Sequence, residues 1–325
     1  MDRTSRFDFR TLPRLVKSLR REATDAVLVT HHHRASLVLG RIASRLSRVP
    51  VDLVAVHDMD LVSVGKRCLP WWTVATLRWC KALVLLAPSQ GAYLHREEHV
   101  GRRPWSRTRE VVIPNGVVLH PLPEAPERAA ARGLLGLDAN HFVIGIVARL
   151  SPQKAHQVLF EAFAQLRQTV PHARLVVVGA GDRAQELRTL ADRLGVEDRV
   201  LFTGLRRDVA ALLPAFDVSC LSSVHEGVPI AAIESMSVGI PMVVTDCGAL
   251  SDIITDGVHG YVVPVGDSDA ISSRLLALAQ SATLRERLGD SARKRVEQMY
   301  SIDQTARGYE DLLVNLVGVS AWRQR

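Results

Sequence analysis

The sequence predicts an α/β fold made of two doubly wound domains, each a parallel sheet covered by helices. Short runs rich in β-branched residues alternate with amphipathic segments along the chain, which is typical of parallel strands joined by helices. The length of 325 residues is also long for one compact domain and sufficient for two. Together these two observations favour a two-domain α/β protein.

Short apolar runs bounded by polar or turn-forming residues are predicted to be strands, and the intervals between them to be helices. The runs in the first part of the chain cover residues 26–30, 53–57, 82–87 and 110–113. Those in the second part cover residues 142–148, 174–178, 200–203, 218–221, 242–245 and 260–263. Residues 155–170 repeat apolar side chains at helical spacing.

A change of composition over residues 119–139 marks the predicted domain boundary. Pro121, Pro123 and Pro126 indicate an extended connection, and a short segment rich in Ala and Arg follows it. We therefore assign residues 1–118 to an N-terminal domain and residues 119–305 to a C-terminal domain. The second has strands enough for a complete doubly wound sheet, whereas the first has few for that architecture.

The composition argues against several classes of protein. Apolar residues make up 47% of the chain, so we do not expect disorder. No run of 18 apolar residues predicts a membrane-spanning helix, and the start has no apolar segment of the signal-peptide type. The cysteines form no Cys-x-x-Cys pair, which suits a reducing cytosol rather than a disulfide framework or zinc ribbon. They are Cys68, Cys80, Cys220 and Cys247.

The formal net charge of +7 suits anionic partners, although an ordinary solvated basic surface explains it equally well. Basic side chains crowd the first 21 positions and residues 102–109. The 5% of aromatic residues is too sparse for a base-stacking platform, so we expect no nucleic acid partner. The basic start with Trp71, Trp72 and Trp79 could instead lie on an anionic membrane; packing of these tryptophans inside the N-terminal domain is the alternative.

The segment from His225 to Glu234 is the most informative motif. A predicted strand precedes it, Pro229 suits the first turn of a helix, and Gly239-Ile240-Pro241 ends that helix. Helix N-terminal amides suit a phosphate, and Glu234 lies about one turn inside, where it can accept hydrogen bonds from sugar hydroxyls. Glu226, in the loop, could reach another part of the same ligand. The alternative is a surface loop with two unrelated glutamates.

Arg149 and Lys154 lie on one predicted loop, between the strand over 142–148 and the helix over 155–170. Two cations at the carboxyl end of a strand, beside the start of a helix, form a suitable clamp for a pyrophosphate. Either cation alone is more often an ordinary solvated side chain. Their combination with the acidic motif favours a binding site for a phosphorylated ligand.

Six motifs follow one another along the chain: Pro114-Asn115-Gly116-Val117, Arg149 with Lys154, Gly179-Ala180-Gly181, Gly204, Glu226-x7-Glu234 and Gly248. In this order they resemble the motifs of the family 4 glycosyltransferases, whose GT-B fold consists of two Rossmann-like domains. The resemblance covers roughly residues 20–315, and each motif is weak alone but specific in combination.

The resemblance implies a retaining hexosyltransferase that uses a UDP-, GDP- or ADP-sugar as donor, with no metal and no other cofactor. The acceptor would be a glycan or a lipid-linked sugar, in the synthesis of a cell-surface polysaccharide or glycolipid. The protein would be cytoplasmic, with peripheral contact to the inner face of the plasma membrane left open. By the same resemblance, a C-terminal helix over residues 306–325 would pack back on the N-terminal domain.

The resemblance also assigns roles to the site residues. Arg149 and Lys154 would grip the diphosphate, and Glu234 would bind the ribose. Glu226 would address the transferred sugar and phosphate together with a run of backbone that comprises Gly227, Val228, Pro229 and Ile230.

Three further residues complete the predicted site. Leu205, after Gly204, would lie against the base, and Gly179 would belong to the donor-binding loops. His57 ends the strand over 53–57, where the family often places a histidine that faces the donor sugar; a purely structural histidine is the alternative. The predicted catalytic residues are therefore His57, Glu226, Arg149 and Lys154.

Two sequences resemble metal motifs but are not expected to bind metal. Asp58-Met59-Asp60 has the DxD spacing that holds a divalent cation in other glycosyltransferases, which have a single-domain fold and lack the other motifs. His31-His32-His33 has no partner ligands nearby in the sequence. Gly179-Ala180-Gly181 hints at a dinucleotide fingerprint, but no acidic residue ends the next strand.

The sequence departs from the family pattern at three places. Ala155 replaces a usual glycine after the lysine, and Asp252 stands where a glutamate is common. The first strands of the N-terminal domain and their glycine-rich loop have no counterpart before residues 11–30, which predicts an incomplete sheet with an exposed edge. A start further upstream and a shortened homologue both explain this. A non-catalytic nucleotide-sugar-binding homologue and a sugar-nucleotide epimerase therefore stay open as alternative functions.

Overall fold

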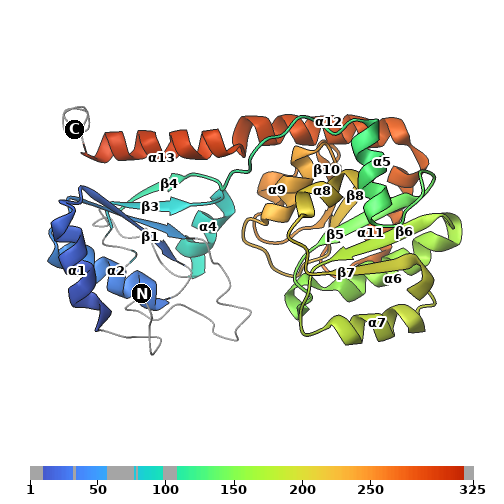
Figure 1. Cartoon of the computed structure of the whole chain (residues 1–325), viewed down its shortest axis with the longest axis horizontal. Helices are drawn as coiled ribbons and strands as arrows, with labels where there is room; N and C mark the ends of the chain where they lie inside the picture. The colour runs from blue at the N-terminus through green and yellow to red at the C-terminus, as the bar shows by residue number, and fades with distance from the viewer. Residues whose placement is uncertain (1–9, 32–33, 57–76, 78–79, 98–107, 318–325) are drawn as a thin grey trace. The chain divides into compact units, whose positions relative to one another are not determined.

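A computed structural model describes residues 10–31, 34–56, 77, 80–97 and 108–317. The chain divides into two compact units, one of Met1–Asn115 with Asp303–Arg325 and one of Gly116–Ile302 (Figure 1). The division predicted from the sequence falls at residues 118 and 305. Within the described residues, no helix is both long and apolar enough to cross a membrane.

The smaller unit contains a parallel sheet in the order β1-β2-β3-β4. Its strands are β1 (Ala26–His31), β2 (Val51–Val56), β3 (Ala82–Leu85) and β4 (Arg109–Val112). Its described helices are α1 (Thr11–Arg21), α2 (Arg34–Leu46), α4 (Pro88–Glu97) and α13 (Ile302–Val317). In the described part of this unit, β1 is an edge strand, as the incomplete sheet predicted from the sequence requires.

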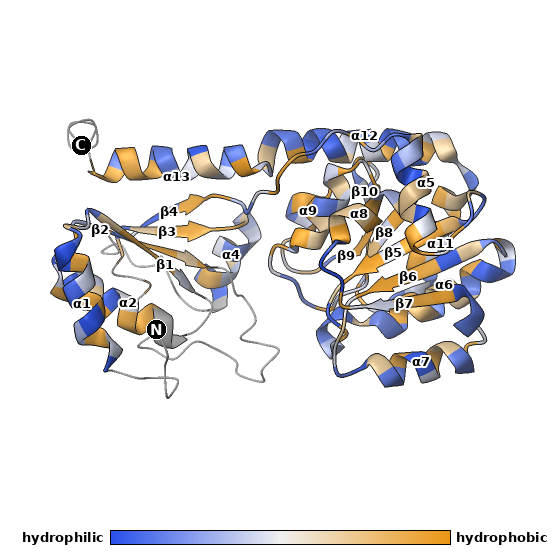
Figure 2. Ribbon diagram, in the orientation of Figure 1, coloured by the Kyte–Doolittle hydropathy of each residue, from blue (hydrophilic) through white to orange (hydrophobic). Residues whose placement is uncertain are grey.

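Alternation along the strands divides the core of the smaller unit between two faces of the sheet. Val54 and Leu83 point to one face, where they pack with buried residues of α2 and α4. Leu53 and Val84 point to the other face, which Leu312 of α13 covers. The hydropathy colouring of Figure 2 accordingly shows predominantly apolar strands and helices of mixed character. The unit is therefore a sheet covered by helices on both faces.

The larger unit contains six parallel strands in the order β10-β9-β8-β5-β6-β7. They are β5 (Phe142–Val147), β6 (Ala173–Val178), β7 (Val200–Gly204), β8 (Val218–Leu221), β9 (Met242–Thr245) and β10 (Gly260–Val263). The chain builds outward from β5 through β6 to β7, then returns to the other side of β5 for β8. This reversal makes the junction of β5 and β8 the switch point at which doubly wound sheets bind ligands.

Helices cover both faces of the larger sheet. One face packs against α6, α7, α9, α11 and α12, and the other against α5, α8 and the short turn η3. These helices are α5 (Ala125–Leu134), α6 (His156–Thr169), α7 (Ala184–Arg193), α8 (Val209–Leu212), α9 (Ile230–Ser237), α10 (Leu250–Ile253), α11 (Ser268–Gln280) and α12 (Ala282–Met299), with 3-10 turns η1 (Pro152–Lys154), η2 (Glu197–Arg199) and η3 (Leu213–Ala215).

The predicted α/β class is confirmed, and each predicted strand is present with ends that differ by at most two residues. Buried parallel strands read as continuous apolar runs, which is why they could be found without other information. The helix predicted over 155–170 is α6, and the short helix after Glu226 is α9.

Candidate functional site

The switch point brings together two loops that carry most of the predicted site residues. The loop from β5 to α6 holds Arg149 and Lys154, and the loop from β8 to α9 holds Glu226. Because β5 and β8 are neighbours in the sheet, with Ile144 paired to Val218, their carboxyl ends open at the same place. The fold thus places the predicted cations beside the predicted carboxylate.

Partly buried Lys154 and buried Glu226 form an ion pair between the two loops. The Lys154 Nζ atom donates to Glu226 Oε1 at 2.6 Å and to Oε2 at 2.7 Å. Glu226 is 3% exposed, so its charge depends on this partner. The ammonium group has three protons, and one remains for a phosphate oxygen.

A tight turn at Ala155, directly after η1, follows the lysine that pairs with Glu226. Ala155 takes a left-handed backbone conformation with φ of 43° and is fully buried. An alanine in this region costs about 1 kcal/mol, because its Cβ approaches the following carbonyl, whereas glycine avoids that penalty. Ala155 can therefore take the place of the usual glycine, at the cost of backbone strain at this position.

Further contacts join the two loops. Gln153 donates from Nε2 to the His225 carbonyl at 2.9 Å, and the Val224 amide donates to the Gln153 carbonyl at 2.9 Å. The Ser222 hydroxyl donates to the carbonyl of Lys154 at 3.1 Å. These bonds satisfy loop backbone groups that would otherwise be costly to bury, and so the relative placement of Lys154 and Glu226 is well determined.

Two glycines of the predicted motifs act through close backbone approach. A Cβ on Gly248, whose φ is +57°, would lie 1.7 Å from the carbonyl oxygen of Glu226. A Cβ on Gly179 would lie 2.0 Å from the Ala148 carbonyl oxygen, next to Arg149. Both positions require glycine, because backbone atoms cannot yield as a flexible side chain can. The contact of Gly179 supports the cationic loop; its contact with a ligand stays a prediction.

Arg149 differs from Lys154 in having no partner. Its side chain is exposed and forms no ion pair or hydrogen bond with any described residue. Leu205, which follows Gly204, is 75% exposed, a high value for a large apolar side chain. A free cation and a free apolar surface suit the diphosphate and base contacts that the resemblance implies.

Helix α9 contributes its N-terminus and Glu234. Pro229 precedes the helix with an extended backbone, and no side chain caps it. Glu234 is partly buried, and burial raises the pKa of its carboxyl. It shares with Ile230 one wall of a largely apolar cavity of about 690 Å³ between α5, α8, α9 and the connection at residues 116–123. A carboxylate in such a cavity favours a ligand that donates hydrogen bonds, as paired hydroxyls do.

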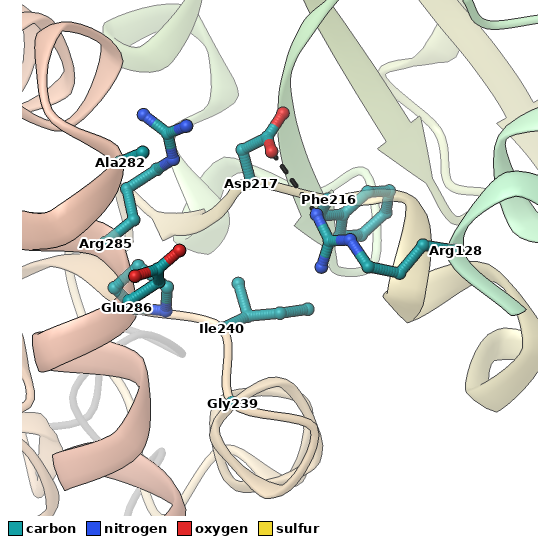
Figure 3. Close-up of a pocket in the computed structure, with 9 residues that line it drawn as sticks. Arg128, Phe216, Asp217, Gly239, Ile240, Ala282, Arg285 and Glu286 are labelled. Carbon is teal, nitrogen blue, oxygen red and sulfur yellow. Dashed lines mark hydrogen bonds and ion pairs between the residues drawn. The ribbon is translucent and has the colours of Figure 1, made fainter. Parts of the chain in front are cut away.

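A second cavity, of about 330 Å³, lies at the opposite end of the larger sheet. Figure 3 shows Arg128 and Asp217 on one side, and Arg285 and Glu286 of α12 on the other. None of the predicted site residues lines it. One of its two carboxylates is already satisfied, since Asp217 accepts from Arg128 at 3.4 Å and from Arg132 at 2.8 Å. We therefore assign this end of the sheet a structural role.

Two neighbouring residues were missed in the sequence. Ser223 donates from Oγ to Glu226 Oε1 at 2.5 Å and is fully buried. His156 is also fully buried, and neither ring nitrogen has a hydrogen-bond partner among the described residues. Burial, with added repulsion from Arg183 and Lys154, lowers the pKa of His156 to about 4. The sequence around a single serine or histidine does not show that its side chain is buried or which group it contacts.

Several predicted residues cannot be placed. His57, Asp58, Asp60, His32 and His33 lie outside the described residues. Among the residues that the structure describes, no cluster of three His, Cys, Asp or Glu side chains could hold a metal ion. The role of His57 and the expected independence from metal thus stay predictions.

Comparison with known proteins decides the family. Residues 127–295, just over half of the chain, match the sequence profile of the family described as glycosyl transferases group 1. The chain belongs to this family. The predicted resemblance to glycosyltransferases is thereby confirmed, and the matched region contains Arg149, Lys154, Glu226 and Glu234.

Individual relatives of this glycosyltransferase support the same family membership. The UDP-Gal:alpha-D-GlcNAc-diphosphoundecaprenol alpha-1,3-galactosyltransferase of Escherichia coli is 27% identical over 318 residues, which are 95% of this chain and 80% of that protein. The putative glycosyltransferase EpsD of Bacillus subtilis is 32% identical over 197 residues, which are 59% of this chain. The chain spans about half of the length of EpsD (51%).

A solved structure of similar fold confirms the GT-B architecture of the glycosyltransferase. HepE from Anabaena, in complex with UDP, superposes with a TM-score of 0.81 at 23% identity, over 94% of this chain and 82% of HepE. At this identity the likeness concerns the fold. The roles of the individual site residues rest on the geometry described above.

Proposed function

We propose that this glycosyltransferase transfers a hexose from a nucleotide diphosphate sugar to a glycan or lipid-linked acceptor, with retention and without metal. The observation that carries the proposal is the convergence, at one switch point, of Arg149, Lys154 and the N-terminus of α9 with Glu226. The cations and the helix N-terminus supply fixed positive charge where the diphosphate leaves. This is the charge that a divalent cation supplies in other phosphoryl chemistry.

In this proposal each residue of the site binds a different part of the donor. Arg149 and the remaining proton of Lys154 bind the diphosphate, Glu234 accepts from the ribose hydroxyls, and Leu205 lies against the base. Glu226 accepts from a hydroxyl of the transferred hexose, assisted by the backbone of residues 227–230. As the bond from the anomeric carbon to the phosphate oxygen breaks, the acceptor oxygen bonds to that carbon from the same face and gives its proton to the leaving phosphate, so the configuration is retained.

The names of the relatives favour particular substrates. The E. coli relative is named for UDP-Gal and a diphosphoundecaprenol acceptor, and HepE was solved with UDP. A phosphatidyl-myo-inositol mannosyltransferase of Mycobacterium leprae is another relative, 32% identical over 206 residues. We therefore propose a UDP-hexose as the first donor to test, before GDP- and ADP-sugars, and a lipid-linked sugar as the first acceptor.

A lipid-linked acceptor is reached at a membrane surface, and α1 offers a surface of the right charge. This helix has no acidic residue, and its Arg14 and Lys17 side chains are exposed. We propose peripheral contact with anionic lipid at the cytoplasmic face. Sedimentation with anionic vesicles should be salt-sensitive and weaker for Arg14→Ala/Lys17→Ala; equal binding to neutral vesicles would contradict the proposal.

The test of the proposed function is transfer by the purified chain. Incubation with UDP-galactose or UDP-glucose and a polyprenyl diphosphate sugar should extend the acceptor with an α-linked hexose, and EDTA should not stop the reaction. The variant Arg149→Met should lose most of the activity while remaining folded. A β-linked product, or a requirement for a divalent cation, would contradict the retaining or metal-independent part of the proposal.

The described sheet of the smaller unit has four strands, with β1 at one edge. This observation supports a non-catalytic homologue as a second candidate. That candidate predicts thermal stabilisation by the nucleotide sugar without turnover. An epimerase, in contrast, would convert the donor with no acceptor present. Following the donor and the acceptor in the same reaction separates the three functions.

A further inference from the structure

The two oxygens of the Glu226 carboxylate are not equivalent. Oε1 accepts from Lys154 Nζ at 2.6 Å and from Ser223 Oγ at 2.5 Å, whereas Oε2 accepts, among the residues that the structure describes, only from Lys154 Nζ, at 2.7 Å. A carboxylate oxygen has two acceptor positions. Oε1 is therefore filled by protein donors, and Oε2 keeps one position for another donor.

Ser223 is held so that its hydroxyl can serve only this carboxylate. The residue is fully buried, and its carbonyl accepts from Thr245 Oγ1 at 2.5 Å and from the Cys247 thiol at 3.3 Å. Its single hydroxyl proton goes to Glu226. Because β9 fixes the Ser223 backbone through Thr245, the direction of the hydroxyl is set by the core of the larger unit.

We propose that Ser223 is a positioning residue that fixes the rotation of the Glu226 carboxylate and so directs one of its acceptor positions at the transferred sugar. The inference rests on the proposed function, and deepens it, since neither the family resemblance nor the comparisons assign a role to Ser223. The last torsion of a glutamate is broad, and the bonds from Lys154 to both oxygens leave the carboxylate a range of angles about it. The bond from Ser223 narrows that range, so that the other oxygen, Oε2, keeps a fixed direction toward one sugar hydroxyl.

The consequence is selective for the sugar part of the donor. Loss of the Ser223 hydroxyl removes one donor to Oε1 and leaves Arg149, Lys154, the N-terminus of α9 and Glu234 unchanged. The nucleoside diphosphate should thus bind as before, while the nucleotide sugar loses a well-directed hydrogen bond. A merely structural role would weaken both ligands by the same factor.

The experiment is calorimetric titration of the full chain with UDP and UDP-glucose, or with the GDP or ADP pair if the wild type prefers it. For Ser223→Ala we expect UDP-glucose to bind about tenfold more weakly and UDP to change less than about twofold. Ser223→Thr, which keeps the hydroxyl, should restore the ratio of the two affinities. Thr245→Val, which loosens the Ser223 backbone, should change that ratio in the same direction by about threefold.

Ser219→Ala is the matched control. Ser219 is a buried serine at the middle of β8 whose hydroxyl donates to the Ser235 hydroxyl at 2.9 Å, away from Glu226. It should leave the ratio of affinities unchanged. If Ser223→Ala weakens both ligands equally, or neither, the positioning role is wrong although the proposed function stands. If the wild type binds none of the three ligand pairs, the proposed function is wrong and the inference falls with it.

Discussion

The two ends of the larger sheet carry similar, largely shielded ion pairs that differ in how many of their hydrogen-bonding positions are filled. At the amino end, Asp217 accepts from two arginines and from the Val143 amide at 2.8 Å, and Arg132 donates from Nη1 to three carbonyl oxygens as well. At the carboxyl end, Glu226 keeps an acceptor position and Lys154 keeps a proton.

The difference teaches how a structural pair is distinguished from a functional one in the same fold. Both pairs are largely shielded from solvent and both join separate segments, so burial does not separate them. The two pairs differ instead in their unused donor and acceptor positions. Such positions matter because a buried polar group without a partner is costly unless a ligand supplies one. The unpaired Arg149 and the fully buried His156 both lie close in sequence to Lys154, between β5 and the start of α6.

The largest effects should come from removing the cation of each pair. Lys154→Met and Arg132→Met each leave a buried carboxylate without its main partner, and each should lower the free energy of unfolding by about 3 kcal/mol. Only Lys154→Met should also lower the transfer rate of the folded enzyme, by about a hundredfold or more. Denaturant unfolding and initial rates measure the two effects. Equal loss of activity in both variants would remove the distinction between the two ends.

Arg149 sharpens the comparison because it is a cation without a partner. Arg149→Met should lower the transfer rate by about a hundredfold and change the free energy of unfolding by less than about 0.5 kcal/mol. Arg188→Met is a suitable control, because Arg188 of α7 belongs to no predicted site. Its guanidinium carbon lies 4.4 Å from the centre of the Phe202 ring. A stability loss in Arg149→Met comparable to that of Lys154→Met would show that Arg149 has a structural partner.

Much of the larger unit and part of its candidate site could be predicted from the sequence, for physical reasons. Strand β5 is a continuous apolar run because it is buried on both faces, and the Glu226-x7-Glu234 spacing survives in the loop and first turn of α9. The ion pair between Lys154 and Glu226 could not be predicted, since it joins residues 72 positions apart. The hydroxyl of Ser223 and the buried ring of His156 acquire their roles only through packing.

His156 makes the carboxyl end sensitive to acid. The unfolded imidazole binds a proton below about pH 6.5, whereas the native one does so only below about pH 4. The unfolded state therefore binds more protons between these values, and native stability is full above pH 6.5 and falls as the pH drops toward 4, by on the order of 3 kcal/mol. Unfolding of His156→Leu should lose this part of the pH dependence. An unchanged difference between pH 7 and pH 4.5 would contradict the burial of a neutral ring.

The smallest expected effect concerns Ala155. Ala155→Gly should raise the free energy of unfolding by up to about 1 kcal/mol, because the backbone at φ of 43° no longer opposes a Cβ. Gly133→Ala, in α5 with open space around its Cα, is the complementary control and should be stabilising for the opposite reason. Thermal unfolding followed by circular dichroism measures both. A loss of stability in Ala155→Gly would mean that the Ala155 methyl group contributes more packing than strain.

The most direct test of the central claim is the affinity of the chain for UDP, or for the nucleoside diphosphate that the wild type prefers, in three proteins compared by calorimetry. The claim is that the carboxyl end of β5 and β8 is the donor site and that the amino end is structural. It predicts equal affinities for the wild type and Arg132→Met, and at least tenfold weaker binding by Lys154→Met. Wild-type affinity in Lys154→Met, or a matching loss in Arg132→Met, would contradict it.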